Sequence, residues 1–69
     1  MFDKRRFRAQ VVLSGKTYAE IAKELEMSEA TLYRRINADG DFTRSEINTL
    51  ITILNIEDPH DIFFAEELA

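Results

Sequence analysis

Two capping boxes constrain the fold of this chain more than any other feature. Residues 17–20 (TYAE) and 43–46 (TRSE) each place a threonine three positions before a glutamate. In such a box the threonine hydroxyl accepts from the glutamate backbone N–H and the carboxylate accepts from the threonine N–H, which marks a helix start. An apolar stripe with helical spacing follows each box. The stripes are Tyr18, Ile21, Ala22 and Leu25 after the first box, and Ile47, Leu50, Ile51 and Leu54 after the second.

Similar end signals predict three further helices. The first runs from near Asp3 to Ser14 and stops at Gly15, with an apolar face of Phe7 and Val11 that Phe2 and Leu13 flank. Ser28 caps a helix over 29–36 whose inward pair is Leu32 and Ile36, and turn-forming residues predict a loop over 37–41. Asp58 as N-cap and Pro59 at the first helical position open the last helix, which carries Ile62, Phe63, Phe64, Ala65 and Leu68.

These signals predict an all-α fold of five short helices without a sheet. The β-branched runs Val11-Val12 and Ile51-Thr52-Ile53 are compatible with strands, but the caps around them and the helical period favour helix. A chain of 69 residues has room for one domain, which we expect to span residues 1–69.

Composition argues against several classes of protein. The chain has no cysteine, and its one histidine, His60, cannot form a metal site alone. It has no glycine-rich phosphate loop and no paired carboxylates typical of a catalytic pocket, so we expect neither an enzyme nor a cofactor or small-molecule substrate. No apolar run is long enough for a signal peptide or a membrane span.

Charge is unevenly distributed along the chain. The formal net charge is −4, but residues 1–37 carry eight basic and five acidic groups, whereas 38–69 carry one basic and eight acidic groups. Phosphates respond to the local field more than to total charge, so the basic half is compatible with a nucleic-acid partner. An ordinary solvated surface explains the same distribution equally well.

Residues 17–36 contain two short helices joined by a tight turn at Glu26 and Met27. Helices connected in this way cross steeply and approach closely where a small residue permits it, here Ala22. We expect Leu25, Met27 and Leu32 to seal the corner. The second helix would then form a ridge that fits the major groove of duplex DNA.

The segment TYAEIAKELEMSEATLYRRIN resembles the helix-turn-helix of the Cro and lambda-repressor-like (XRE-type) regulators of phages and bacteria. The segment FTRSEINTLITILNIEDPHDIFF is similar to the fourth and fifth helices of that family, so the resemblance covers essentially the whole chain. Two positions depart from it. Glu26 stands where the family usually has glycine, and Arg35 stands where it often has an apolar residue, with Ile36 as the apolar anchor instead.

This resemblance implies a compact five-helix lambda-repressor-like domain that represses or otherwise regulates transcription in the cytoplasm of a bacterial or phage-infected cell. It implies a double-stranded DNA operator as partner and a homodimer at least on DNA. The helix over 28–36 would read the major groove, with base contacts from Glu29, Ala30, Tyr33 and Arg34. The DNA backbone would be held by Lys16, Thr17, Tyr18, Arg35, Asn37 and Arg44.

Other interpretations of these residues remain open. Tyr18 can be a core residue, Tyr33 can pack against the helix that begins near 44, and Arg34 and Arg35 can be solvated charges. Adjacent residues on a helix point about 100° apart, so only one of Phe63 and Phe64 can easily face the core.

The acidic second half is the candidate surface for self-association, through Ile56, Phe63, Phe64 and Leu68. An alternative function is a protein-interaction module or anti-repressor of the same fold, kept off DNA by its net negative charge and bound to another regulator or to polymerase.

Overall fold

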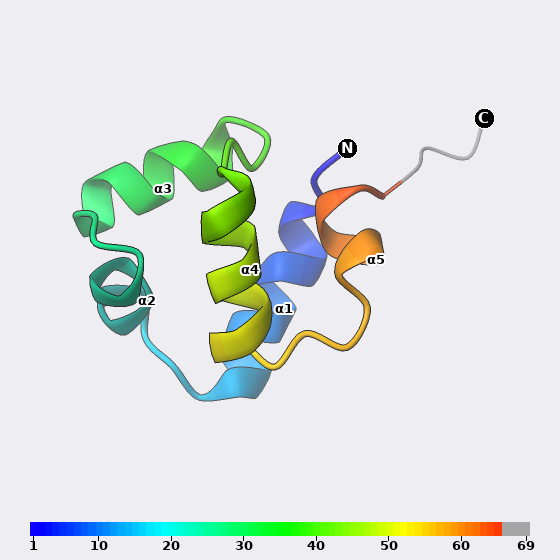
Figure 1. Cartoon of the computed structure of the whole chain (residues 1–69), viewed down its shortest axis with the longest axis horizontal. Coiled ribbons are helices and arrows are strands. Elements are labelled where there is room, and N and C mark those ends of the chain that lie inside the picture. The colour runs from blue at the N-terminus through cyan, green and yellow to red at the C-terminus, as the bar shows by residue number, and fades with distance from the viewer. Residues whose placement is uncertain (66–69) are drawn as a thin grey trace.

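The computed structural model describes residues 1–65, which form five α-helices and no strand (Figure 1). The all-α expectation is therefore confirmed for this part of the chain, and both β-branched runs lie in helices. The elements are α1 (Lys4–Ser14), α2 (Tyr18–Glu24), α3 (Glu29–Asn37), α4 (Arg44–Ile53) and α5 (Pro59–Phe63). Among them, no helix is both long and apolar enough to cross a membrane.

The first four helices begin where a side chain caps them. Asp3, Thr17, Ser28 and Thr43 each accept the backbone N–H three positions ahead. Both predicted capping boxes are present. Thr17 donates its N–H to Glu20 Oε1 at 2.9 Å, and Thr43 donates its N–H to Glu46 Oε1 at 2.8 Å. Each such cap contributes about 1 kcal/mol by satisfying a donor that the helix leaves unpaired.

Four helices are followed by a residue in the left-handed region: Gly15 after α1, and residues other than glycine after α2, α3 and α4. Glu26, Asp39 and Asn55 have φ angles of 57°, 61° and 53°. After α2, Met27 donates its N–H to the Ala22 carbonyl and Glu26 to the Lys23 carbonyl. This pair of bonds is the Schellman motif. Glutamate thus takes the left-handed conformation at the position where the resemblance implied glycine.

The core is one cluster with contributions from every helix. Phe7, Ile21, Leu32, Leu50 and Leu54 are fully buried. At one end, the Phe2 ring packs against the rings of Phe7, Phe42 and Phe63, with centroids 5.4, 6.2 and 5.9 Å away. The N-terminus is also held by a hydrogen bond of 2.7 Å from the Asp3 N–H to the Ile62 carbonyl.

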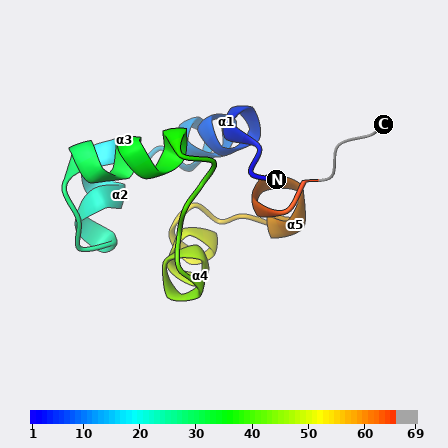
Figure 2. The same ribbon diagram turned by 90° about the horizontal axis from the view of Figure 1, so that it is seen from above.

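Figures 1 and 2 place α2 and α3 at one end of the molecule and α5 at the other, with α1 and α4 between them. The axes of α2 and α3 are strongly inclined to each other in both views. This arrangement keeps α5 at the opposite end of the molecule from α2 and α3.

Three local predictions are wrong. The last helix ends at Phe63, so Phe64 and Ala65 lie beyond it, and Leu68 is outside the described residues. Asp58 makes no side-chain capping bond; Pro59 still occupies the first turn. Leu13 does not flank the buried face of α1: it is 79% exposed, because two residues of helix rotate it about 200° away from Val11.

Candidate nucleic-acid interface

The turn between α2 and α3 is sealed by apolar side chains, as predicted. Ala22 and Leu25 are buried on α2, Leu32 is fully buried on α3, and Met27 packs partly buried against the same cluster. Ala22 is buried in this cluster, and its small side chain is compatible with a close approach of the two helices. The packing and the Schellman motif together hold α3 at a defined angle to α2.

The side of α3 that faces away from the core is exposed. Glu29, Ala30, Tyr33, Arg34 and Asn37 are all accessible to solvent, while Leu32 and Ile36 are buried. The predicted inward pair is therefore confirmed, with Ile36 as the apolar anchor. Exposure of the four residues expected to contact bases leaves their side chains able to reach a partner of any kind.

Tyr18 and Tyr33 form an aromatic pair between α2 and α3. Their ring centroids are 5.1 Å apart with an interplanar angle of 33°. Tyr18 packs partly buried against the core, and Tyr33 remains 45% exposed. The Tyr33 ring therefore packs on Tyr18 at the start of α2, and its exposed part adds to the exposed side of α3.

Arg35 is held by Glu46 on α4. The Arg35 Nη1 to Glu46 Oε1 distance is 2.6 Å, and both side chains are largely shielded from solvent. Glu46 also accepts from the Thr43 N–H, so one carboxylate caps α4 and fixes the end of α3. A charge-assisted bond of this kind offsets the guanidinium charge. Arg34, in contrast, is exposed and has no ion pair within residues 1–65.

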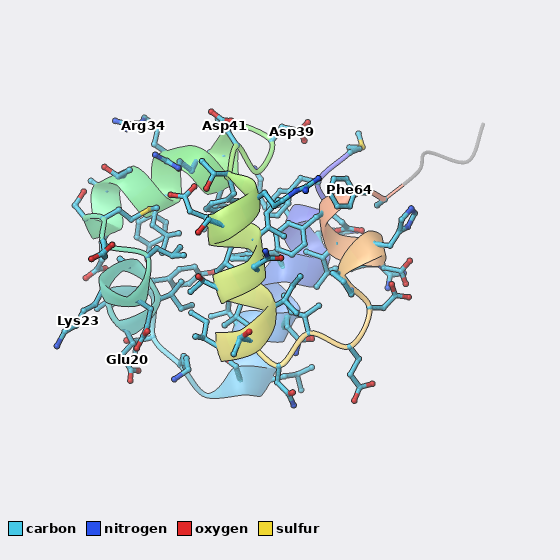
Figure 3. The ribbon with its side chains drawn as sticks, in the orientation of Figure 1. Glu20, Lys23, Arg34, Asp39, Asp41 and Phe64 are labelled. Atoms are coloured by element: carbon cyan, nitrogen blue, oxygen red, sulfur yellow. The ribbon has the colours of Figure 1, made fainter. Side chains whose placement is uncertain are left out.

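Acidic residues lie close to Arg34. Arg34 and Asp41 line one shallow groove together with Phe42 and Thr43. Figure 3 shows Arg34, Asp39 and Asp41 projecting on the same side of the molecule. Asp39 and Asp41 come from the loop between α3 and α4 and were not assigned to the site from the sequence, because turn chemistry explained them fully. They reduce the positive potential that a phosphate backbone would meet.

The start of α2 is occupied by its own capping box. The Thr17 hydroxyl accepts from the Glu20 N–H at 3.1 Å, and the Thr17 N–H is donated to the Glu20 carboxylate. The Thr17 backbone N–H that the carboxylate accepts is the main group that holds the pKa of Glu20 below its ordinary value of 4.5, with smaller contributions from the Thr17 side chain and Lys16. The carboxylate is therefore ionised at neutral pH, and it accepts a backbone N–H at the start of α2.

The remaining predicted contacts lie on the same half of the molecule. Lys16 precedes α2 and is partly exposed, Asn37 ends α3, and Arg44 begins α4. Asn37 and Arg44 are exposed. Lys16, Arg34 and Arg44, like Lys23 on α2, have no described carboxylate within ion-pair distance.

The residues predicted for self-association differ in their exposure to solvent. Ile56 and Phe63 are buried in the core, so their side chains are not on the surface. Phe64 is 56% exposed, which confirms that only one of the two adjacent phenylalanines faces the core. Leu68 lies outside the described residues. Within residues 1–65, no group of three or more histidine or acidic side chains is placed to hold a metal ion.

Comparison of the chain with protein-family models, with curated proteins and with solved structures finds no match.

Proposed function

We propose that this protein is a sequence-specific double-stranded DNA-binding regulator of transcription. The fold would be of the lambda-repressor type, with α2 and α3 as a helix-turn-helix and α3 in the major groove. One observation carries the proposal: α3 is anchored by Leu32 and Ile36 at a steep angle to α2, while its other side is exposed. A helix held in this way has the shape that the major groove admits.

The exposed side of α3 carries groups that can distinguish base pairs. The Arg34 guanidinium can donate two parallel hydrogen bonds to guanine O6 and N7, and the Glu29 carboxylate can accept from cytosine N4. The Ala30 methyl group can contact the thymine methyl. Lys16, Asn37 and Arg44 would contact phosphates on either side. Occupation of a promoter by such a domain blocks polymerase, and a homodimer would read two half-sites.

The test is binding of the chain to duplex DNA from upstream of its own coding sequence and to a scrambled duplex of equal length. We expect tighter binding to the upstream duplex and a loss of about 10–100-fold for Arg34→Ala, the value of one good base contact. Lys23→Ala is the matched control. It removes the same charge from α2, where Figure 3 shows Lys23 pointing away from Arg34.

A second variant is expected to raise the affinity for duplex DNA. Asp41→Asn removes an acid beside Arg34 without changing its size, so a DNA-binding protein should bind duplex DNA more tightly at low salt. With two phosphate-directed cations, Lys16 and Arg44, log K should fall with log salt with a slope of about −2. Absence of binding to either duplex for the parent chain and for Asp41→Asn would refute the DNA-binding proposal.

The acidic groups favour one second candidate, a protein-interaction module of the same fold. Glu20 accepts a backbone N–H at the start of α2, and Glu46 forms an ion pair with Arg35. Asp41 lines the same groove as Arg34. The half of the molecule that would face DNA therefore has few uncompensated cations. In that case Tyr33 and Arg34 would contact a protein surface, for which both residue types are well suited. Binding to another regulator or to polymerase that Arg34→Ala weakens, without any binding to duplex DNA, would identify this function.

A further inference from the structure

The two capping boxes of this chain differ in one respect. In both, the glutamate carboxylate accepts the backbone N–H of the threonine that caps the helix, at 2.9 Å for Glu20 and 2.8 Å for Glu46. Glu20 forms no ion pair within residues 1–65, whereas Glu46 Oε1 also accepts from Arg35 Nη1 on α3. The carboxylate of the second box therefore has a contact that capping α4 does not require.

Arg35 is held by its main chain as well as by this ion pair. Its carbonyl accepts the backbone N–H of Gly40 at 3.1 Å and that of Asp41 at 3.2 Å, in the loop that follows α3. Its guanidinium lies 2.6 Å from the Glu46 carboxylate on α4. The two main-chain hydrogen bonds do not involve the side chain, so they hold the end of α3 and its loop together when the ion pair is removed.

The Arg35 side chain borders the surface that carries Arg34. Both arginines line the shallow groove between the end of α3 and the residues that precede α4, and the Arg35 side chain is 32% exposed. Asp41 lines the same groove but forms no ion pair with Arg35. Carboxylates and phosphates accept from the same guanidinium donors, so Glu46 competes with a phosphate for Arg35.

We propose that Glu46 is a positioning residue that withholds Arg35 from the DNA backbone and so limits the affinity of this protein for duplex DNA. This inference rests on the proposed function, because it states which cations of that same interface contact phosphates. While Arg35 is paired, Lys16 and Arg44 are the phosphate-directed cations. Arg35 becomes a third when the Glu46 charge is removed.

Glu46→Gln removes this charge and keeps the cap, since glutamine also serves at this position of a capping box. Binding to the upstream duplex is measured over about 50–300 mM salt. We expect the slope of log K against log salt to change from about −2 to about −3, and the affinity at about 50 mM salt to rise about tenfold, because one more phosphate contact releases counterions. Glu20→Gln is the matched control. It neutralises the carboxylate of the box without an ion pair, and the slope should stay at about −2.

Arg35→Gln separates a new phosphate contact from a general gain in positive charge. In the parent it should leave the slope unchanged, because Arg35 contacts no phosphate there. In the Glu46→Gln background it should return the slope from about −3 to about −2. A gain in affinity for Glu46→Gln that does not depend on Arg35, or a slope that falls equally in both backgrounds, overturns the inference and leaves the proposed function intact.

Urea unfolding without DNA tests the ion pair by itself. The double variant should lose less stability than the sum of the losses in Arg35→Gln and Glu46→Gln, because all three lack the same pair. Additive losses overturn the inference whether or not DNA binds. Coupled losses with no DNA binding by the parent or by Glu46→Gln overturn both the inference and the proposed function. Binding by Glu46→Gln alone supports the inference and refutes DNA binding by the parent chain.

Discussion

Glu26→Gly is expected to stabilise this protein. Glu26 has a φ of 57° at the end of α2, where its N–H and that of Met27 complete a Schellman motif. The left-handed conformation costs a residue with a Cβ about 1–2 kcal/mol. The Glu26 side chain is exposed and makes no hydrogen bond within residues 1–65, so its removal sacrifices no contact there.

The expected gain follows from two opposing effects. Glycine relieves the left-handed cost in the folded state, but it makes the unfolded chain more flexible, which costs about 0.5–1 kcal/mol. The net gain is about 0.5–1 kcal/mol in the free energy of unfolding. For a domain of this size, that gain raises Tm by about 2–8 °C.

Thermal and urea unfolding followed by circular dichroism measure this gain. Asn55→Gly is a matched comparison: Asn55 has a φ of 53° in the equivalent position after α4, but asparagine tolerates this conformation better, so the gain should be smaller. Lys23→Gly, within α2, should instead destabilise by about 0.5–1 kcal/mol. If Glu26→Gly lowers the free energy of unfolding as Lys23→Gly does, the turn is not left-handed and the reasoning fails.

Three further outcomes follow from the fold. Leu32→Ala should destabilise by about 2–5 kcal/mol in urea unfolding, because Leu32 is fully buried at the α2–α3 corner. Gly40→Ala should lower Tm more than Gly15→Ala: both glycines have positive φ, but only a Cβ at Gly40 would overlap the Phe2 ring. The lowered pKa of Glu20 means that its contribution to stability is complete above its ordinary pKa of 4.5 and is lost as pH falls through the lower folded value. Glu20→Gln should therefore cost more Tm near pH 7 than near pH 3; an equal cost at both would contradict the assignment.

Much of the local structure could be predicted because it depends on near neighbours. The caps at Thr17, Ser28 and Thr43 involve residues three positions apart, and the structure forms all of them. The inward stripes were predicted equally well, since helical period alone decides which residues share a side. One error is Leu13, which lies off the buried side of α1. The others lie at α5, where a helix of five residues leaves too little pattern to place its end.

The candidate site was only partly predictable. The positions of Leu32 and Ile36 in the sequence predicted which side of α3 is exposed. The sequence did not predict the ion-pair partner of Arg35. Glu46 is 11 positions away and was assigned only to its capping box, yet it serves both the cap and the ion pair. The acidic surroundings of Arg34 were missed for a related reason, because Asp41 already had a local explanation as a turn residue.

The sequence alone determined where most of the helices begin, which side of each is apolar, and that residues 1–65 fold without a sheet. These properties arise from interactions within one or two turns, which the order of residues specifies directly. Only the tertiary structure decided which charges are compensated, that Tyr33 rests on Tyr18, and that Leu13 borders a groove. Such contacts join residues far apart in the chain, as between Gln10 and Leu54, and depend on how the helices pack together.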